Sequence, residues 1–229
     1  MTGGFLDIAS PVIQNYSPPC DVVHRVKAHD NSGQCLAFRP GSNKIATGGG
    51  DGIVKVWSSD LSSEPKSVRV CNGHVAFLTF NRSGHLLAAC DSKSVISLIK
   101  LKPTPSVAGV LQGHNDIITS CAFTSDEKRQ LLSVSQDRTL RIWNLQTGKQ
   151  IKMCSFPSAG SALDVSKNDA YFATGHKNGD IRFWSLSELR EIDLVSKVHT
   201  SLIACVKFTP DGTRLVSSAL DNEIKVTDV

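Results

Sequence analysis

The chain has 229 residues, with 25 Lys and Arg against 21 Asp and Glu, and a formal net charge of +4. Hydrophobic residues make up 40% of it, beside 17 Gly and 9 Pro, which is typical of a turn-rich all-β protein with one sizeable core. The cations are scattered, so the sequence argues against a nucleic-acid partner. No apolar stretch approaches the ~18 residues that a membrane-spanning helix needs.

Residues 1–20 are rich in Gly and Pro and predict a flexible lead-in. The first ten residues lack a charged region followed by an apolar core, so no secretion signal is visible, and we expect a cytoplasmic protein. The seven Cys show no zinc-ligand spacing and favour free thiols in a reducing compartment. Residues 21–27 alternate enough to predict an outer β-strand at the start of a repeat domain that spans residues 21–229.

The first repeat, residues 28–59, predicts three strands in succession. Cys35–Phe38 is short and apolar, and the Pro- and Gly-containing turn at 40–43 leads into a second strand at Lys44–Thr47. A tight turn and a third strand with alternating apolar residues, Ile53–Trp57, follow.

Four positions of this repeat return later in the chain at matching distances. The sets are His29, Thr47, Asp51 and Trp57 in the first repeat, His114, Ser133, Asp137 and Trp143 in the third (residues 113–145), and His199, Ser217, Asp221 and Thr227 in the fifth (residues 198–229). The fifth set has Thr in place of Trp.

The second and fourth repeats are degraded. The second, residues 73–101, keeps His74 but has Ala89 at the hydroxyl position, Lys93 at the Asp position and Ile99 at the Trp position. The fourth, residues 155–186, keeps Thr174 and Trp184, has Asn178 for Asp, and shows Ser155-Phe156 where Gly-His is expected. These two repeats must depend more on apolar packing.

The Trp positions follow one another at steps of 42, 44, 41 and 43 residues. We expect the four polar groups of a repeat to form one buried chain, in which the indole N–H donates to the hydroxyl, the hydroxyl to the His and the His to the Asp. A Ser/His/Asp set resembles a hydrolase triad, but three copies at one period indicate structural braces. We therefore predict no catalytic, cofactor-binding or metal-binding residue.

A period of 40–45 residues that ends in a Trp-Asp-like dipeptide resembles the WD-repeat β-propeller, an all-β fold built from four-stranded blades. Five repeats are visible, whereas seven blades are usual. We interpret the chain as a truncated seven-bladed propeller, with closure by five blades as the alternative. An unclosed form exposes an apolar face and an unpaired edge, so it should be poorly soluble unless it closes or finds a partner.

The order of regular and degraded repeats over residues 22–229 is similar to the first five blades of the autophagy-related protein 16 family. The stretches that carry the resemblance are Ala28–Asp30, Ile45–Trp57, Asp137–Leu145, Thr174–Trp184 and Lys225–Asp228. The resemblance implies a scaffold of autophagosome formation that supports attachment of the ubiquitin-like autophagy-related protein 8 to phosphatidylethanolamine. In that family an N-terminal helical region binds the autophagy-related protein 12–5 conjugate and a coiled coil dimerises the protein. This sequence shows neither segment and lacks the last two blades.

Partners of propellers usually bind the loops that lead into the first strands and the turns between the second and third strands. We expect Phe156, in place of the usual His, to be an exposed anchor there, with inward packing of its ring as the alternative. The other candidates are turn residues, namely Asn115, Asp116, His176, Lys177 and Lys93.

The sequence thus favours a non-catalytic scaffold that binds proteins such as the autophagy conjugation machinery or cargo adaptors, in the cytoplasm or at pre-autophagosomal membranes. Any membrane contact is expected to be peripheral, and the oligomeric state stays open. The alternative is a generic WD adaptor, such as the substrate receptor of a ubiquitin ligase or a trafficking subunit. An enzyme would need a further convergent set of polar residues in the central channel, and the sequence shows none beyond the braces.

Overall fold

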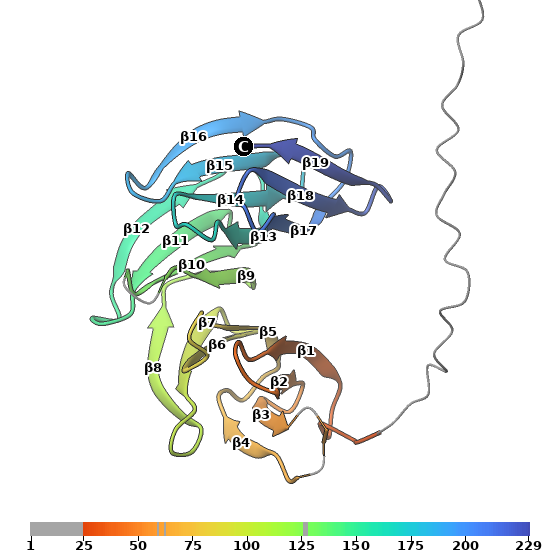
Figure 1. Ribbon diagram of the computed structural model, residues 1–229, viewed down its shortest axis with the longest axis vertical. Helices are drawn as coiled ribbons and strands as arrows, with labels where there is room; N and C mark the ends of the chain where they lie inside the picture. Colours follow the sequence, from red (N-terminus) through yellow and green to blue (C-terminus); the bar gives the residue numbers. More distant parts are fainter. Residues whose placement is uncertain (1–24, 59, 62, 126–127) are drawn as a thin grey trace, which may run out of the picture.

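The computed structural model describes residues 25–229 apart from 59, 62 and 126–127, and within these residues the chain forms strands, turns and loops. Its nineteen described strands make five antiparallel sheets, which we call blades 1 to 5 (Figure 1). Blades 1 to 4 have four strands and blade 5 has three. The lead-in predicted for residues 1–20 lies outside the described residues.

The strands in chain order are β1 (Gly33–Phe38), β2 (Lys44–Gly49), β3 (Ile53–Ser58) and β4 (Lys66–Arg69) in blade 1, β5 (Val75–Phe80), β6 (Leu86–Asp91), β7 (Val95–Lys100) and β8 (Ser106–Gln112) in blade 2, β9 (Ile118–Phe123), β10 (Gln130–Ser135), β11 (Thr139–Asn144) and β12 (Gln150–Ser155) in blade 3, β13 (Gly160–Val165), β14 (Tyr171–His176), β15 (Ile181–Ser185) and β16 (Arg190–Val195) in blade 4, and β17 (Ile203–Phe208), β18 (Arg214–Ala219) and β19 (Ile224–Asp228) in blade 5.

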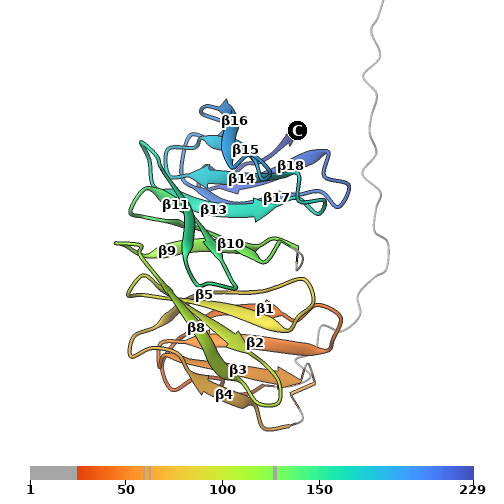
Figure 2. The same ribbon diagram turned by 90° about the vertical axis from the view of Figure 1, so that its left-hand side faces the viewer.

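The blades follow one another around a common centre. The first strand of each blade lies innermost and β4, β8, β12 and β16 lie on the rim, so that the blades form an arc (Figure 1), and the view at right angles shows them stacked in chain order (Figure 2). Each pair of neighbouring blades encloses its own apolar cluster. This is the propeller architecture that the sequence predicts.

The first strand of every blade carries a β-bulge near its start, which bends the strand where it lines the centre. In blades 3 and 4 the extra residue is a hydroxyl residue that joins neighbouring blades. Thr119 Oγ1 donates to the carbonyl of Gly160 at 2.8 Å, and Ser161 Oγ donates to the carbonyl of Ile203 at 2.6 Å. The bulge therefore supplies polar contacts between blades in addition to the apolar clusters.

The turn between the second and third strands needs a residue with positive φ in every blade. Glycine fills it in blade 4, where Gly179 has a φ of +85° and a Cβ would lie 1.9 Å from the carbonyl oxygen of His199. The close passage of the loop into blade 5 therefore excludes any side chain there. The corresponding Arg138 in blade 3 has a φ of 64° without being glycine.

A polar network on the side of the turns between first and second strands joins three blades. The guanidinium of Arg82, between β5 and β6, donates to Asp169 Oδ1 at 2.7 Å and to the carbonyl of Ser166 at 3.0 Å in blade 4. Asp169 is only 6% exposed, and its other carboxylate oxygen accepts the N–H of Ser125 in blade 3 at 2.8 Å. A buried carboxylate is stable when it is paired in this way.

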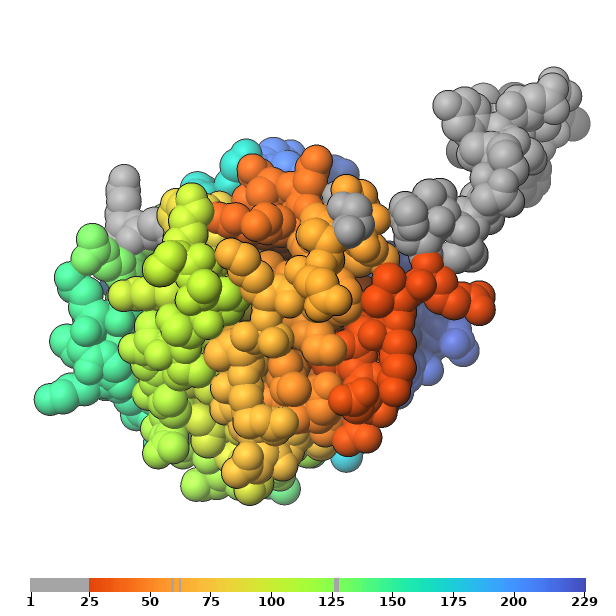
Figure 3. All heavy atoms as spheres, turned by 90° about the horizontal axis from the view of Figure 1, so that it is seen from below, coloured from red at the N-terminus to blue at the C-terminus, as the bar shows by residue number. Residues whose placement is uncertain are grey.

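The two ends of the arc expose the apolar residues that are buried between blades elsewhere. Leu36 and Phe38 of β1 are 61% and 69% exposed, whereas their counterparts in β5, Leu78 and Phe80, are 4% and 9% exposed. Seen from below, blade 1 forms much of the visible surface (Figure 3). At the other end Val226 of β19 is 59% exposed.

The outer strand predicted at residues 21–27 is wrong for the part that the structure describes. Arg25, Val26 and Lys27 lie in no strand, and residues 21–24 are outside the described residues. Among the described residues nothing pairs with β19 as a fourth strand of blade 5. The first and fifth blades stand at opposite ends of the arc, so residues 25–27 do not reach the edge of β19 (Figure 1).

We expect Phe38→Ser to reduce self-association of the chain with little change in its melting temperature, because this ring is already largely in water. The matched change Phe80→Ser removes a ring from the cluster between blades 1 and 2 and should cost roughly 3–5 kcal/mol. Sedimentation velocity and thermal unfolding of both variants check the contrast. Equal destabilisation by the two substitutions would contradict it.

Candidate functional site

The loops that enter the first strands and the turns between second and third strands lie at the same edge of every blade, and we call this side the entry-loop face. In all five blades a backbone N–H of the turn donates to a carbonyl of the entry loop. The pairs are Gly50 with Ser32, Ser92 with His74, Gln136 with Ile117, Lys177 with Ala159, and Leu220 with Leu202, at 2.8–3.0 Å. The face is therefore a set of paired loops held by the strands beneath them.

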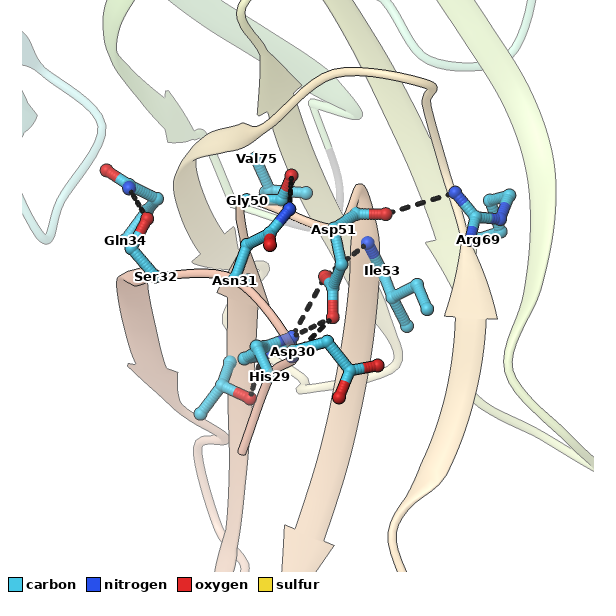
Figure 4. A network of polar contacts seen from close by, with 12 residues as sticks. His29, Asp30, Asn31, Ser32, Gln34, Gly50, Asp51, Ile53, Arg69 and Val75 are labelled. Carbon is cyan, nitrogen blue, oxygen red and sulfur yellow. Dashed lines mark hydrogen bonds and ion pairs between the residues drawn. The ribbon is translucent and has the colours of Figure 1, made fainter. Parts of the chain in front are cut away.

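Blade 1 shows how side chains hold an entry loop. His29 Nε2 lies 2.9 Å from Thr47 Oγ1, which also accepts the indole N–H of Trp57 at 2.9 Å. His29 Nδ1 lies 3.0 Å from Asp51 Oδ1. The carboxylate of Asp51 also accepts the N–H of Ile53 at 3.1 Å, so it joins the entry loop to the turn (Figure 4).

Blade 3 has the same arrangement with shorter distances. His114 Nε2 and the indole N–H of Trp143 both contact Ser133 Oγ at 2.8 Å, and His114 Nδ1 contacts Asp137 at 2.8 Å. Burial opposes ionisation of Asp137, but the hydrogen bonds from Thr139, the N–H of Asn115 and His114 lower its pKa overall. The carboxylate therefore stays charged and accepts hydrogen bonds from three residues.

Blade 5 contains the same set without the Trp. His199 Nε2 lies 2.8 Å from Ser217 Oγ and its Nδ1 2.9 Å from Asp221. Among the described residues His199, Asp221 and Glu223 are the one group whose ligand atoms lie close enough to hold a metal ion. The imidazole is already occupied on both nitrogens, so the group fits the role of a brace better than that of a metal site.

Blade 4 lacks the His of the entry loop, and a His of its second strand takes the same role. His176, at the end of β14, places Nε2 3.0 Å from Thr174 Oγ1, which accepts the indole N–H of Trp184 at 3.1 Å. Its Nδ1 lies 3.3 Å from the carbonyl of Ser158 in the entry loop. His176 is 1% exposed, so its prediction as a partner-binding residue is wrong.

Phe156 is the second correction. Its side chain is 6% exposed, and its ring lies edge-on to His176 at 4.5 Å and to Trp184 at 5.7 Å between ring centroids. The ring fills the volume left by the missing entry-loop His, which is the alternative that the sequence left open. The sequence indicates this replacement of the entry-loop His by the run Thr174-Gly175-His176. The His follows the hydroxyl residue by two positions, so both side chains lie on one face of the strand.

Blade 2 has no His–hydroxyl brace among the described residues, because Ala89 replaces the hydroxyl residue. Asp91, two residues before the predicted Lys93, is 6% exposed, and its Oδ1 accepts the N–H groups of Lys93 at 2.8 Å and Val95 at 3.0 Å. The carboxylate thus bonds N–H groups within its own turn and does not join the turn to the entry loop. Lys93 lies in this turn, and its side chain is exposed to solvent.

The entry-loop face is hollowed between blades 3 and 4. A depression of about 350 Å³ is lined by residues of three blades, including Asp116, Arg138, Pro157, Lys177 and Leu202. The side chains of Asp116, Arg138 and Lys177 are exposed and form no ion pair with another described residue. Two predicted partner residues, Asp116 and Lys177, therefore lie together here.

The other predicted residues lie around the depression rather than in it. Asn115 is exposed and donates its N–H to Asp137 at 2.9 Å, while Lys93 belongs to blade 2. Arg138 was missed by the sequence analysis, although its place after the brace Asp137 marks it as a turn residue on this face. The depression offers two cations and one carboxylate around Pro157 and Leu202, which suits recognition of a peptide with acidic and apolar groups.

A narrow channel lies at the centre of the arc. This channel of about 300 Å³ runs between β5, β9, β13 and β17, and its charged residues are Arg82, Asp164 and Lys207. Lys207 pairs with Asp164 at 2.6 Å, and Arg82 is held by Asp169. These groups are engaged in contacts between blades.

The family model for the WD domain, G-beta repeat, matches residues 20–58, 106–144, 150–185 and 193–228. The chain belongs to the WD40 family. The first three strands of blade 2, which lacks the brace, fall in the unmatched interval between residues 58 and 106, whereas β8 lies within a matched range. The WD40 match agrees with the hydrogen-bonded sets that the structure shows in blades 1, 3 and 5.

Several curated proteins are similar to this chain to a comparable degree. Autophagy-related protein 16 of Arabidopsis thaliana is 24% identical, with 92% of this chain and 41% of that protein covered. The guanine nucleotide-binding protein subunit beta of Oryza sativa subsp. japonica is 26% identical, with 92% and 60% covered. Protein tipD of Dictyostelium discoideum is 22% identical, with 92% and 34% covered. The chain spans less than two thirds of the length of each.

Ser133→Ala should destabilise the WD40 fold, because it leaves the buried His114 and Trp143 nitrogens without an acceptor or donor partner. Each unpaired buried group costs about 1–3 kcal/mol. Ser217→Ala in blade 5 is the matched control, since only His199 loses its partner there. Urea unfolding should show the larger loss for Ser133→Ala, and an equal loss would contradict the shared role of this hydroxyl.

Stability should fall as the pH drops from about 6.5 to about 4. Burial lowers the pKa of His176 from 6.5 to about 4, and burial also lowers that of His114. Below pH 6.5 the unfolded chain binds a proton that folded His176 does not, so unfolding is favoured, by roughly 3 kcal/mol for a shift of this size. His176→Gln should flatten the pH profile of unfolding over this window, whereas an unchanged slope would show that this His does not set it.

Proposed function

We propose that this WD40 chain serves as a non-catalytic protein-interaction scaffold in autophagosome assembly. The observation that carries the proposal is the similarity to autophagy-related protein 16 along 92% of the chain. In this role the chain brings adaptors or cargo to the machinery that attaches autophagy-related protein 8 to phosphatidylethanolamine. It would act from the cytoplasm at pre-autophagosomal membranes. Among the described residues there is no helix suited to crossing a bilayer.

The geometry of the entry-loop face supports a binding role. In blades 1, 3 and 5 the braces fix the entry loop to the turn beside it, so little conformational entropy is lost there when a partner binds. The depression at Asp116, Arg138 and Lys177 combines exposed charges with Pro157 and Leu202 on this rigid base. We assign the partner surface to this depression.

The alternative is a WD adaptor outside autophagy, such as a ubiquitin-ligase receptor or a trafficking subunit. The similarity to guanine nucleotide-binding protein beta subunits supports this second class of function, because they are 25% and 26% identical to this chain and autophagy-related protein 16 is 24% identical. Both classes predict the same fold and the same use of loops. They differ in the proteins that bind.

Affinity purification of the tagged protein from its own cells, followed by mass spectrometry, tests the proposal. We expect autophagy conjugation proteins or cargo adaptors among the companions, with enrichment on starvation. Recovery of ubiquitin-ligase, trafficking or G-protein subunits in their place would overturn the autophagy role.

The variant Arg138→Glu/Lys177→Glu should weaken capture of these companions about ten-fold or more, because both cations at the depression are reversed. Its control is Lys149→Glu/Lys167→Glu, which makes the same charge change at exposed residues on the opposite side of the blades. Neither variant should lower the melting temperature by more than a few degrees. Equal capture by both variants would place the partner elsewhere.

A further inference from the structure

A second groove lies on the side opposite the entry-loop face, between blades 2 and 3. It has a volume of about 740 Å³ and is lined by the turn before β6, the connection between β7 and β8, the segment after β9 and the connection between β11 and β12. All four connections belong to the side that carries the turns between first and second strands. The groove therefore shares no lining residue with the depression at Arg138 and Lys177.

The floor of the groove is apolar. Leu101 and Phe123 are buried, and Leu86 and Leu145 are half-buried beside them. Leu101 belongs to the cluster between blades 1 and 2, while Phe123 belongs to the cluster between blades 2 and 3. The floor is thus the edge of two packed cores, which makes it a rigid surface for an apolar side chain.

The rim is basic. Lys100, Lys102, Arg129 and His85 are exposed around the groove, and the described lining residues include no Asp or Glu. The lysines and the arginine form no ion pair with another described residue. Asp126 and Glu127, which follow Ser125 in the sequence, lie outside the described residues. Among the described lining residues, three cations without an ion-pair partner surround an apolar floor, and this favours an anionic ligand that also has an apolar part.

Arg129 is held in place by its backbone. It adopts a φ of 50°, its N–H donates to the carbonyl of Ser125 at 3.3 Å, and its carbonyl accepts the N–H of Leu145 at 3.0 Å. Left-handed backbone is costly for a residue other than glycine and persists where neighbouring groups fix it. These two hydrogen bonds fix the backbone of Arg129 and also position Leu145 of the floor.

A neighbouring groove extends the basic surface. It lies between blades 1 and 2, has a volume of about 670 Å³, and shares Leu101 and Lys102 with the first. Arg39, Lys44 and Lys66 line it, against the single described acid Glu64. An extended ligand that crosses the connection between β7 and β8 would meet cations on both sides.

We propose that this groove, which we call the basic groove, docks an acidic peptide segment whose apolar side chains reach the floor at Leu101 and Phe123. Nucleic acid fits less well, because the floor is mostly aliphatic and offers no row of exposed aromatic rings for stacking bases. A flat bilayer cannot reach the floor of a groove between two blades. The basic groove is separate from the entry-loop face, and its test does not depend on a role in autophagy.

The test uses the full chain and a fluorescein-labelled synthetic peptide rich in Glu and Asp that carries a pair of Leu residues. Fluorescence anisotropy should show binding that weakens as salt increases, because charge attraction is screened. The same peptide with Ser for Leu, and a Lys-rich peptide with the Leu pair retained, should each bind at least ten-fold more weakly. Equal binding of all three peptides would overturn the proposal.

Lys100→Glu/Arg129→Glu should weaken binding of the acidic peptide at least ten-fold. Lys93→Glu/Lys197→Glu makes the same charge change at exposed residues on the entry-loop side and should leave the affinity within two-fold. Retained affinity in the first variant, or equal loss in both, would show that general charge rather than the basic groove binds the peptide.

Sedimentation with vesicles that contain anionic lipid distinguishes the remaining source of negative charge. Binding to vesicles that is lost in Lys100→Glu/Arg129→Glu, with no binding of the peptide, would assign the cations to a membrane surface and overturn the proposal. Loss of capture of autophagy proteins in the Arg138→Glu/Lys177→Glu variant reports on the entry-loop face alone, so failure of one proposal leaves the other to be judged separately.

Discussion

Every blade in this fold has two apolar faces, and each face is buried only where another blade lies against it. This constraint explains the arrangement of the whole arc. The four clusters between neighbouring blades bury their residues almost completely, while Leu36, Phe38 and Val226, at corresponding positions in the end blades, are more than half exposed. Stability in such a repeat fold is a sum over neighbouring pairs. Each inner blade is therefore stabilised by two interfaces with other blades, and each end blade by one.

Polar contacts then decide how precisely the loops are held. The apolar clusters have no directional preference, whereas the His, hydroxyl and Asp groups fix an entry loop to one geometry. Blade 3 has the complete set, with distances of 2.8 Å throughout, and blade 2 has no His–hydroxyl contact among the described residues. The depression on the entry-loop face lies beside blade 3, whose entry loop is held by this complete set.

Much of the fold was predictable from the sequence, because the spacing of His29, Asp51 and Trp57 and of their later copies reflects local register. The replacement of the entry-loop His by His176 and Phe156 in blade 4 could be predicted only in part. A His that contacts Thr174 from the same strand is encoded by adjacent residues, yet the inward turn of Phe156 depends on the volume that the missing His leaves. The contact between Arg82 and Asp169 spans 87 residues, and no local pattern points to it. The basic groove also combines residues of two blades, so neither repeat alone reveals it.

The sequence changes in degraded blade 4 affect which residues are available for binding on the entry-loop face. In blade 4 the sequence change is compensated within the core, since Phe156 packs against Trp184 and His176 contacts Thr174, which also bonds Trp184, and the ring of Phe156 is buried. In the proposed interaction, recognition on that face depends on Arg138, Lys177 and Asp116. These side chains discriminate by charge and give affinity only where a partner also covers Pro157 and Leu202. A partner of this face should accordingly combine acidic groups with a small apolar contact, and its affinity should depend on salt more strongly than that of a partner anchored by an exposed aromatic ring.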